Sequence, residues 1–341
     1  MQEQQRNEHT ITIEPSGRRF GAGADESILD AALRHGIAFP YGCRNGFCGA
    51  CRGRLVSGKV TYPEGAPGIL TEEESARGVA LMCKAHAASD VTVEVREVGD
   101  GKELPVKTLP TRVARMERLA PEVMGLWLKL PESERLQFLP GQYIDILIGE
   151  GRKRAFSLAN APHEDSLLEL HIAQIEGGRF TGTVFEGLHE KDVLRIEGPK
   201  GGFSLDEASD RPILLLAGGT GLAPIRSMLV HLIAEECRRP VFLYRGTREA
   251  RGLYLEAWLC EQAARLDNLQ YVSVLSRPDG QWTGRRGYVQ DAVLADFPDP
   301  SGFDVYCAGP PVMVKGVHDA LIAAGLDRAH FFSDPFEFAK D

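Results

Sequence analysis

Four cysteines could supply thiolate ligands to a single metal centre. They follow the pattern C-x4-C-x2-C with one further cysteine downstream, at Cys43, Cys48, Cys51 and Cys83. This is the spacing that ligates a [2Fe–2S] cluster. Glycines separate the first three cysteines, and glycine lets the backbone turn tightly around an anionic cluster and direct N–H groups at its sulfurs. The pattern therefore predicts an electron-transfer centre.

Two other cysteine chemistries compete with a cluster. A structural zinc site also takes four thiolates, but this spacing is unusual for zinc, and a disulfide pair is the second alternative. The chain has seven cysteines, which fits a reducing compartment where thiols persist. We therefore expect a cytoplasmic protein in which Cys237 and Cys260 are buried thiols.

Charge and hydropathy restrict the partners. The formal net charge is −9, whereas nucleic acid selects basic patches, so no nucleic-acid partner is expected. No uninterrupted apolar stretch approaches the roughly 18 residues of a membrane span, and the first residues are polar rather than a signal peptide. We expect no membrane partner, a protein or small molecule as partner, and a monomer.

The sequence divides into three parts that differ in the spacing of their apolar residues, and these parts must position the candidate residues. With 341 residues the chain suggests two or three domains. Residues 1–98 combine short strands with a helix at 27–35 and another after Thr71, which has capping-box spacing to Glu74. This predicts a small α+β domain, followed by a polar linker with glycine and proline at 99–108.

The remaining two blocks differ in their patterns. Residues 109–207 contain short strand-like runs broken by Gly, Pro and acidic turns, with one helix near 181–187, which is typical of an antiparallel β-barrel. In residues 208–341 strands alternate with helices, which predicts an α/β domain with a parallel sheet. Ligands of such sheets bind beyond the carboxyl ends of the strands.

A glycine-rich turn joins the first strand of the third block to its first helix. It spans residues 218–224, Gly-Gly-Thr-Gly-Leu-Ala-Pro. Backbone amides of such a turn can approach a diphosphate, and a proline suits a first helical turn because it has no N–H. A tight turn without a ligand is the alternative. The candidate nucleotide contacts are Gly219, Thr220, Gly221 and Pro224.

Several short strings resemble the ferredoxin–NADP reductase superfamily. Residues 154–157 (RAFS) are similar to its R-x-Y/F-S signature, and residues 177–181 to its second diphosphate element. Residues 198–203 (GPKGGF) are similar to the string that closes its flavin barrel, and the turn at 218–224 to its G-G-T-G-x-x-P element. With the cysteine block, the chain resembles the iron–sulfur flavoprotein reductases that carry an N-terminal plant-type [2Fe–2S] ferredoxin domain. This resemblance implies a β-grasp-like ferredoxin for residues 1–98.

The resemblance implies roles for residues of the barrel. Arg154 would clamp the FAD diphosphate, Phe156 would cover the isoalloxazine, and Ser157 would reach its N5 edge. The start of the barrel helix would meet the diphosphate through N–H groups and a hydroxyl. The flavin-side contacts expected in addition are Leu158, His171, Ile172, Gly178, Arg179, Phe180 and Thr181.

The nicotinamide side is implied by residues 306–313, which resemble the family's C-G-P-x-x-M string. Gly309 and Pro310 are the expected cofactor contacts. The chain departs from the family at this point, because Cys307 is displaced by one position and would face the other side of a strand. No catalytic thiol is therefore expected here.

The expected catalytic residues come from three separate parts of the chain. The C-terminal segment 331–336 resembles the family's terminal aromatic and acidic segment, which can lie near the flavin. For Phe336, the last aromatic residue of this segment, a role in core packing is an equal alternative to a place near the flavin. The catalytic candidates are Ser157, Thr220, Asp334 and Phe336.

The nucleotide preference depends on arginines after the third strand of the sheet. Ser276 and Arg277 stand where the resemblance places selection of the adenosine ribose, and Arg277 could pair with a 2′-phosphate. Arg248 and Arg251 lie in a neighbouring loop and could add to this effect, or all three could be solvated surface groups. We expect NADH, with NADPH as the alternative.

The implied activity is electron transfer from NAD(P)H through FAD and the [2Fe–2S] cluster to an acceptor protein. Residues 136–145 and 282–284 are similar to reductases of CDP-sugar deoxygenation, whereas the domain order is shared with oxygenase reductase components. The acceptor would be a sugar dehydrase or an oxygenase component that docks near Arg44. The alternatives are a non-catalytic [2Fe–2S] carrier or redox sensor, and a flavin or ferric reductase without a protein acceptor.

Overall fold

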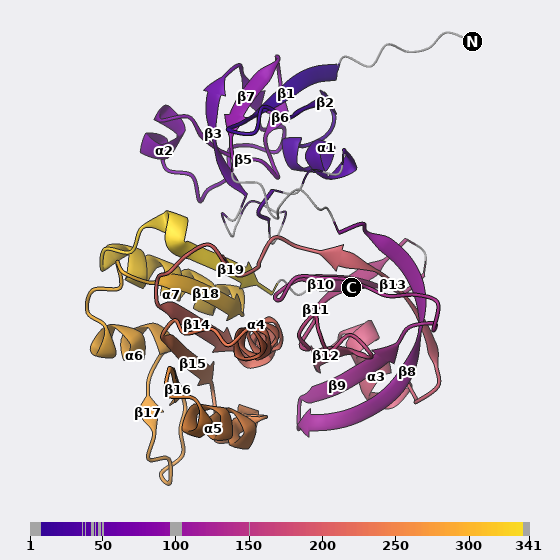
Figure 1. Ribbon diagram of the computed structural model, residues 1–341, viewed down its shortest axis with the longest axis vertical. Helices are drawn as coiled ribbons and strands as arrows, with labels where there is room; N and C mark the ends of the chain where they lie inside the picture. Colours follow the sequence, from indigo (N-terminus) through magenta and orange to yellow (C-terminus); the bar gives the residue numbers. More distant parts are fainter. Residues whose placement is uncertain are drawn as a thin grey trace. The chain divides into compact units, whose positions relative to one another are not determined.

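A computed structural model describes residues 8–35, 37, 39–41, 44, 46, 49, 51–95, 104–149 and 151–336 (Figure 1). The chain divides into two compact units. The first comprises Met1–Pro105 with Gly201–Phe203, and the second comprises Val106–Lys200 with Ser204–Asp341. The second unit contains two sheets of its own. The α+β first unit, the barrel and the parallel sheet confirm the expected fold class.

The first unit is built on a five-stranded sheet of order β2-β1-β7-β3-β5. Its central strands β1 and β7 are parallel, and the other neighbours are antiparallel. Ile11 and Ile13 alternate into the core with no exposed surface. The elements are β1 (Glu8–Glu14), β2 (Arg19–Gly23), α1 (Ile28–Arg34), β3 (Arg52–Ser57), β4 (Val60–Thr61), α2 (Glu72–Ala76), β5 (Val79–Leu81), β6 (His86–Ala87) and β7 (Val91–Glu94).

Both helices of the first unit begin at a capping residue. The Ser27 hydroxyl accepts the N–H of Asp30 at the start of α1. At α2, the Thr71 hydroxyl accepts the N–H of Glu74, and the Glu74 carboxylate accepts the N–H of Thr71. This reciprocal pair satisfies two backbone donors and confirms the capping box expected from the sequence.

The first sheet of the second unit is antiparallel, in the order β11-β10-β13-β8-β9-β12. A bridge between Leu158 and Leu170 joins its two edges, so the sheet closes into a barrel. The helix α3 packs into the barrel core through Val184 (Figure 1). The elements are β8 (Lys107–Ala120), β9 (Val123–Lys129), β10 (Tyr143–Leu147), β11 (Lys153–Ser157), β12 (Leu168–Ala173), α3 (Arg179–Glu186) and β13 (Val193–Lys200).

The strand β8 begins earlier than the residue pattern suggests. Its first part, which includes Pro110, pairs with β13, and the pairing with β9 starts only at Arg112. A proline lacks a backbone donor and is tolerated where a strand has a neighbour on one side only. The strand therefore begins at Lys107, inside the linker expected at 99–108, and includes Pro110.

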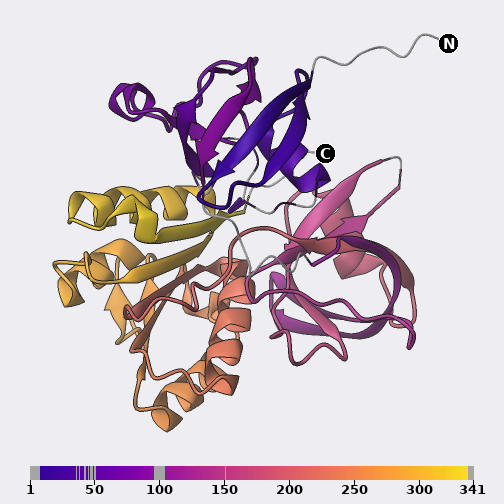
Figure 2. The same cartoon turned by 45° about the horizontal axis from the view of Figure 1, so that its top comes forward.

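The second sheet of this unit is parallel throughout, in the order β17-β16-β15-β14-β18-β19. The helices α4 and α5 cover one face, and α6 and α7 cover the other (Figures 1 and 2). The elements are β14 (Ile213–Gly218), α4 (Leu222–Ala234), β15 (Val241–Thr247), α5 (Glu256–Arg265), β16 (Leu269–Leu275), β17 (Arg285–Arg286), α6 (Val289–Asp296), β18 (Asp304–Gly309), α7 (Pro311–Ala323) and β19 (Phe331–Pro335), with short 3-10 turns η1 (Gly219–Gly221), η2 (Ala250–Gly252) and η3 (Arg328–His330).

The centre of the parallel sheet follows from its composition. Every residue of β14 and β18 is buried, as expected for continuous apolar runs covered on both faces. The C-terminal strand β19 adds to the edge next to β18 and brings Asp334 opposite Ala308. The segment expected to be a terminal aromatic and acidic stretch is therefore a strand of the sheet.

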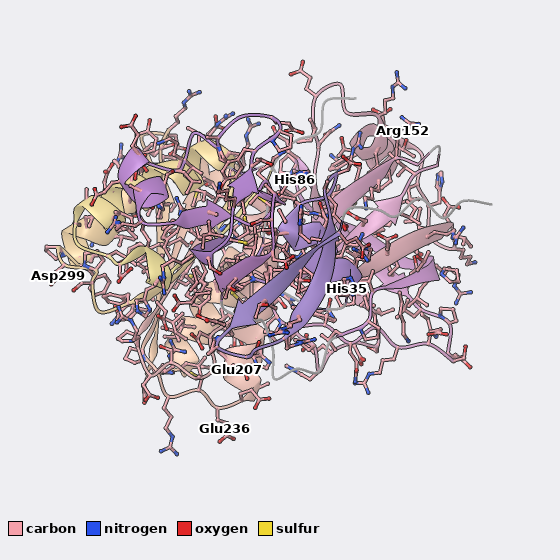
Figure 3. The ribbon with its side chains drawn as sticks, turned by 90° about the horizontal axis from the view of Figure 1, so that it is seen from above. His35, His86, Arg152, Glu207, Glu236 and Asp299 are labelled. Carbon is pink, nitrogen blue, oxygen red and sulfur yellow. The ribbon has the colours of Figure 1, made fainter. Side chains whose placement is uncertain are left out.

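Charged side chains occupy the exterior of the described structure. Figure 3 labels Arg152, Glu207, Glu236 and Asp299, which lie between helices and strands and are all exposed. In the part of the chain that the structure describes, no helix has both the length and the apolar character needed to cross a bilayer.

Candidate functional site

The cysteine loop is described in part. Cys43 and Cys48 lie outside the described residues. Cys51 and Cys83 are buried, with 2% and 7% of their surface exposed. Burial raises the pKa of Tyr62, and the negative charge of the Cys51 and Cys83 thiolates raises it further, so the two cysteines lie near the same phenol.

Glycines allow the tight backbone of this loop. Gly46 and Gly49 have φ angles of +81° and +72°, a region that disfavours residues with a side chain. A Cβ atom at Gly49 would also lie 1.7 Å from Nη1 of Arg52. Two buried thiols beside a backbone that requires glycine fit a thiolate-ligated cluster, and together these features support the cluster prediction.

Arg44 connects the cysteine loop to α1. Its backbone is left-handed, with φ of +58°, and its guanidinium forms an ion pair with Asp30. The second oxygen of the Asp30 carboxylate accepts the Ser27 hydroxyl at 2.7 Å. The loop is thus held to the first turn of the helix by a side chain that sequence reasoning assigned to partner docking.

Two of the expected flavin elements meet inside the barrel. The rings of Phe156 on β11 and Phe180 on α3 lie 5.6 Å apart between centroids. Arg154 is half-buried on β11 and donates to the carbonyl of Lys153 at 3.0 Å. The structure therefore brings the R-A-F-S string into contact with the start of α3, although the two are about twenty residues apart in the sequence.

The start of α3 retains the features of an anion site. Gly178 precedes the helix without a side-chain cap, and the first N–H groups of a helix have no acceptor within it. The Thr181 hydroxyl is used to hold this turn, because it lies 3.2 Å from the carbonyl of Gly178 and 3.3 Å from the N–H of Ile175. Arg179 is exposed. The backbone donors, rather than the hydroxyl, are therefore available to a phosphate.

Three expected flavin contacts are limited to their backbones. Leu158 and Ile172 have no exposed surface and belong to the barrel core. His171 is buried as well, and its two ring nitrogens lie 3.0 Å from Glu169 and 3.1 Å from Tyr254. Since protein groups engage both nitrogens, the expected cofactor contact of His171 could come only from its backbone, and it stays a prediction.

The catalytic candidates Ser157 and Asp334 come together across the second unit. The Ser157 hydroxyl donates to the Asp334 carboxylate at 3.2 Å, although the two are 177 positions apart. The N–H of Phe336 donates to the Gly309 carbonyl at 2.8 Å, which holds the segment after β19 beside the end of β18. These contacts unite the end of β11 with the carboxyl edge of the parallel sheet.

The glycine-rich turn is shaped by close packing on one side and open space on the other. A Cβ at Gly218 would lie 2.3 Å from the Met313 sulfur, and one at Gly221 would lie 2.1 Å from the Ala308 carbonyl. At Gly219, with φ of +55°, a Cβ would meet nothing within 4 Å. Thr220 is half-buried between them, whereas Pro224 is buried in α4. The open side provides the space that a diphosphate needs.

Cys307 and the end of β18 agree with the expected absence of a catalytic thiol. Cys307 has no exposed surface and packs in the hydrophobic core, where burial raises the pKa of its thiol. Pro310 is half-buried and precedes α7. The backbone of Gly309, with φ of +145°, lies against Gly218, and a Cβ there would meet the Gly218 carbonyl at 2.8 Å.

The ribose-side residues lie together at the carboxyl ends of β15 and β16. Ser276 N–H donates to the Thr247 carbonyl at 3.0 Å, and Arg277 N–H donates to the Arg248 carbonyl at 2.8 Å. Arg277 and Arg248 are both exposed. Arg251 differs, because it pairs with Glu249 at 2.8 Å.

Three domain families match successive parts of the chain. Residues 11–88 match the family described as a 2Fe-2S iron-sulfur cluster binding domain, residues 110–205 an oxidoreductase FAD-binding domain, and residues 215–319 an oxidoreductase NAD-binding domain. A CDP-6-deoxy-L-threo-D-glycero-4-hexulose-3-dehydrase reductase from Yersinia pestis is 38% identical over 97% of this chain and 99% of its own length. The chain belongs to the [2Fe–2S] flavoprotein reductases.

Other relatives of this reductase include oxygenase components. The phenol hydroxylase P5 protein of Acinetobacter pittii is 33% identical over 98% of this chain and 96% of that protein. Among solved structures, the Amycolatopsis cytochrome P450 reductase GcoB has a TM-score of 0.76 and 31% identity, and covers 96% of this chain and 98% of that one. The family membership confirms the expected cofactors, namely a [2Fe–2S] cluster, FAD and a nicotinamide nucleotide, and decides against zinc.

Bound FAD supplies this reductase with conversion between two-electron and one-electron chemistry. The residues near the expected site fit such a group. The α3 start offers backbone donors to a phosphate, Ser157 and Asp334 offer a hydroxyl and a carboxylate next to each other, and Gly219 leaves space beside the second helix start. Ser157, Asp334 and the backbone of Gly309 are thus connected at the carboxyl edge of the parallel sheet, and the remaining expected contacts stay predictions.

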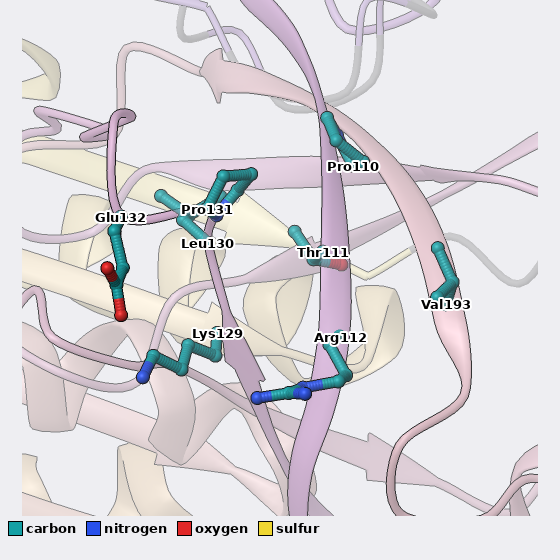
Figure 4. Close-up of a pocket in the computed structure, with 8 residues that line it drawn as sticks. All are labelled: Pro110, Thr111, Arg112, Lys129, Leu130, Pro131, Glu132 and Val193. Atoms are coloured by element: carbon teal, nitrogen blue, oxygen red, sulfur yellow. The ribbon is translucent and has the colours of Figure 1, made fainter.

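A separate cleft of about 270 Å³ lies on the barrel exterior (Figure 4). Arg112 and Lys129 stand opposite each other across β8 and β9 at its floor. Its lining residues are Pro110, Thr111, Arg112, Lys129, Leu130, Pro131, Glu132 and Val193. None of the expected cofactor residues lines this cleft, so it is distinct from the flavin and nucleotide elements.

Sequence reasoning did not identify the partners of His171. Glu169, Arg226, Arg245 and Tyr254 are not part of any glycine-rich string, and they come from both sheets of the second unit. A signal was available in Arg245, a charged residue within an otherwise apolar strand pattern. It has no exposed surface.

Proposed function

We propose that the electron acceptor of this reductase is a separate protein, and that a CDP-sugar dehydrase is the first candidate and an oxygenase component the second. The observation that carries this proposal is the full-length similarity, at 38% identity, to a CDP-hexulose dehydrase reductase. The corresponding identity to the phenol hydroxylase reductase is 33%. Both groups share the three domains, so the acceptor rather than the chemistry of the chain distinguishes them.

The proposed reaction places named residues around the nicotinamide and the flavin. Ser157 orients the reacting edge of the flavin by a hydrogen bond, and Asp334 holds the Ser157 hydroxyl. The proposed nicotinamide contacts are Thr220 and the backbones of Gly309 and Pro310, with Phe336 closing the same edge. Arg154 and the N–H groups at the start of α3 would hold the flavin diphosphate.

The proposed ligands of the cluster are Cys43, Cys48, Cys51 and Cys83. Thiolate ligands and a reducing compartment belong together, because free thiols persist where disulfides are rare. Cys237, Cys260 and Cys307 are free thiols, but Cys237 is only half-buried and Cys260 is exposed, so the expectation that both are buried is wrong. We therefore propose that the reductase acts in the cytoplasm, as a monomer that neither binds nucleic acid nor requires a membrane.

A ligand substitution tests whether the acceptor is a protein that takes electrons from the cluster. In Cys51→Ser, we expect NADH-dependent reduction of a small dye such as ferricyanide to stay within about twofold, since the flavin reduces it directly. Reduction of a purified CDP-sugar dehydrase should fall below about 1% of the wild-type rate. Matched activity losses with both acceptors would contradict the proposal, and so would full retention of both, which is the result expected for a flavin or ferric reductase.

The two candidate acceptors are separated by a direct comparison. Wild-type reductase with NADH is mixed in turn with a CDP-sugar dehydrase and with the terminal component of a phenol hydroxylase. The proposal expects a kcat/KM at least tenfold higher for the dehydrase. The reverse order would assign the reductase to the oxygenase group.

A further inference from the structure

A chain of buried polar groups connects the flavin barrel to the nucleotide sheet within the second unit. Glu169 and His171 lie on β12 of the barrel, and Tyr254 precedes α5 of the nucleotide sheet. His171 Nε2 lies 3.0 Å from Glu169 Oε1, and His171 Nδ1 lies 3.1 Å from the Tyr254 hydroxyl. The His171 and Tyr254 rings meet edge to face, with centroids 5.2 Å apart.

The other end of this series of hydrogen-bonded side chains, at Glu169, contacts a helix that covers the nucleotide sheet. Arg226 on α4 donates to Glu169 Oε2 at 3.0 Å and to the Ala159 carbonyl at 2.7 Å. Its neighbour Ser227 donates to the Asn160 carbonyl at 2.7 Å. Ala159 and Asn160 follow the R-A-F-S string directly. Two separate elements of the nucleotide sheet therefore hold the barrel next to the expected flavin residues.

The protonation states of Glu169 and His171 decide which group donates and which accepts in each of these hydrogen bonds. Burial lowers the pKa of His171, which is therefore neutral and has one donor and one acceptor nitrogen. Burial alone would raise the pKa of Glu169, but the hydrogen bond from His171 and the charge of Arg226 outweigh it and lower the pKa. Glu169 is thus an acceptor, His171 Nε2 donates to it, and the Tyr254 hydroxyl donates to Nδ1.

Tyr254 is itself fixed by a buried arginine. The Arg245 guanidinium lies over the Tyr254 ring at 4.3 Å from the centroid, and it donates to the carbonyls of Tyr254 and Gly252. Arg245 has no exposed surface and ends in a planar fork that suits two carbonyl acceptors. Glu169, His171 and Tyr254 are therefore each held in place by hydrogen bonds to neighbouring buried groups.

We propose that Tyr254 and His171 are positioning residues for hydride transfer, which set the nucleotide turn in register with the flavin barrel. The helix α4 that carries Arg226 begins directly after the glycine-rich turn, and β12, which carries Glu169 and His171, leads into the start of α3. The chain therefore connects the two elements expected to hold the nucleotide and the flavin. Hydride transfer depends on the distance and angle between two bound rings, so it is sensitive to small displacements of these elements.

The substitution Tyr254→Phe tests this inference, because it removes one hydroxyl and keeps the ring over Arg245. Anaerobic stopped-flow measurement of flavin reduction should show a fall of about tenfold at saturating NADH, with the dissociation constant for NADH changed less than twofold. The primary isotope effect with 4-deuterated NADH should rise, since the chemical step becomes slower relative to binding. A purely structural role would leave this isotope effect unchanged.

The matched control is Tyr244→Phe, which removes another buried phenol hydroxyl in the same sheet. The Tyr244 hydroxyl donates to Asp296 at 2.7 Å, and the side chain packs in the core of the parallel sheet. Flavin reduction in this control should stay within twofold of wild type. Equal losses in both variants would assign the effect to general loosening of the sheet and overturn the inference.

A second variant provides a readout that does not depend on turnover. Arg226→Lys keeps the charge but replaces the rigid planar guanidinium, whose Nη1 donates to both Glu169 and the Ala159 carbonyl, by an ammonium on a flexible stem. In the FAD-loaded protein without nucleotide, amide hydrogen exchange should increase at least threefold in β12 and the start of α4 in both Arg226→Lys and Tyr254→Phe. Unchanged exchange in these segments, or a change in NADH affinity without any change in the hydride-transfer rate, would contradict a positioning role.

Discussion

Ser157 and Asp334 show how a single hydrogen bond can define a reactive edge. Ser157 is buried at the end of a barrel strand, with 7% of its surface exposed, and Asp334 is half-buried on the terminal strand of the parallel sheet. A hydroxyl that donates to a carboxylate keeps its lone pairs available as acceptors. The pair therefore presents an oriented hydroxyl that can meet a protonated ring nitrogen.

Substitution of Ser157 by Ala should slow the hydride step without preventing flavin binding. Loss of one hydrogen bond of about 1–1.4 kcal/mol corresponds to a roughly five- to tenfold lower rate. Anaerobic stopped-flow reduction by NADH measures the rate, and the flavin content of the purified protein measures binding. Asp334→Asn should give a smaller fall, because the amide can still accept the hydroxyl. If Ser157→Ala reduced flavin content but not the rate in the remaining holoprotein, the role assigned to Ser157 would be wrong.

Arg277 tests the nucleotide preference. We expect wild-type kcat/KM to be higher for NADH than for NADPH. In Arg277→Ala, the value for NADH should change less than twofold, whereas that for NADPH should fall about tenfold, since a charge-assisted hydrogen bond to a phosphate is worth about 1.5–3 kcal/mol. Arg251→Ala is the control, because Arg251 is paired with Glu249. A wild-type preference for NADPH that Arg277→Ala removes would reverse the assignment.

At this scale the sequence predicts residues that act through local strings and misses those that act through partners. The pair of Ser157 and Asp334 could be proposed from two motifs, although their contact depends on β19 joining the sheet. The side-chain partners of His171 could not be predicted, because Tyr254 becomes its neighbour only after folding. A short pattern records which residue types stand near each other in the chain, not which ones are buried together.

At the scale of elements, side-chain contacts connect the helix α1 to Arg44 of the cysteine loop. Ser27 caps α1, Asp30 follows in its first turn, and Arg44 reaches back from the loop to Asp30. The Arg44 side chain is still 40% exposed. It can therefore serve both as a tie to the helix and as a contact for an acceptor protein.

A charge exchange separates these two roles of Arg44. Arg44→Asp should slow reduction of the acceptor protein about three- to tenfold at low salt, as is usual for a charge at the rim of an interface, and leave dye reduction unchanged. The double variant Asp30→Arg/Arg44→Asp restores the internal pair with reversed polarity. If docking requires a positive charge at position 44, the double variant stays slow. Recovery of the wild-type rate in the double variant would show that only the tie to α1 matters.

Element prediction succeeded where one force decides the conformation. The capping box expected at Thr71 starts α2, and the barrel helix expected near 181–187 forms α3 at Arg179–Glu186. The sequence did not predict β17, which is only two residues long, or the start of β8 at Lys107 inside the expected linker. Short edge strands and one-sided strands depend on a neighbour that the local sequence does not specify.

At the scale of the whole molecule, the reductase consists of two compact units with separate cores. The core of the first unit surrounds Cys51 and Cys83 themselves, which pack with the apolar residues of the ferredoxin sheet. The cores of the barrel and of the parallel sheet belong to the second unit. A small domain of about 90 residues buries limited apolar surface, so ligands contribute a large share of its stability.

Removal of the cluster should therefore destabilise one unit and not the other. Calorimetry of the holoprotein should resolve separate transitions, and a ligand that binds only the folded state raises the transition of the unit that holds it. In Cys83→Ser, or after anaerobic chelation of iron, the transition of the first unit should fall by roughly 10 °C or more, because a loss of a few kcal/mol shifts a domain of this size by several degrees for each kcal/mol. The transition that responds to added FAD should move by less than 2 °C. A common shift of both transitions would show that the two units unfold together, and no shift in either would show that the cysteines do not ligate a group on which folding depends.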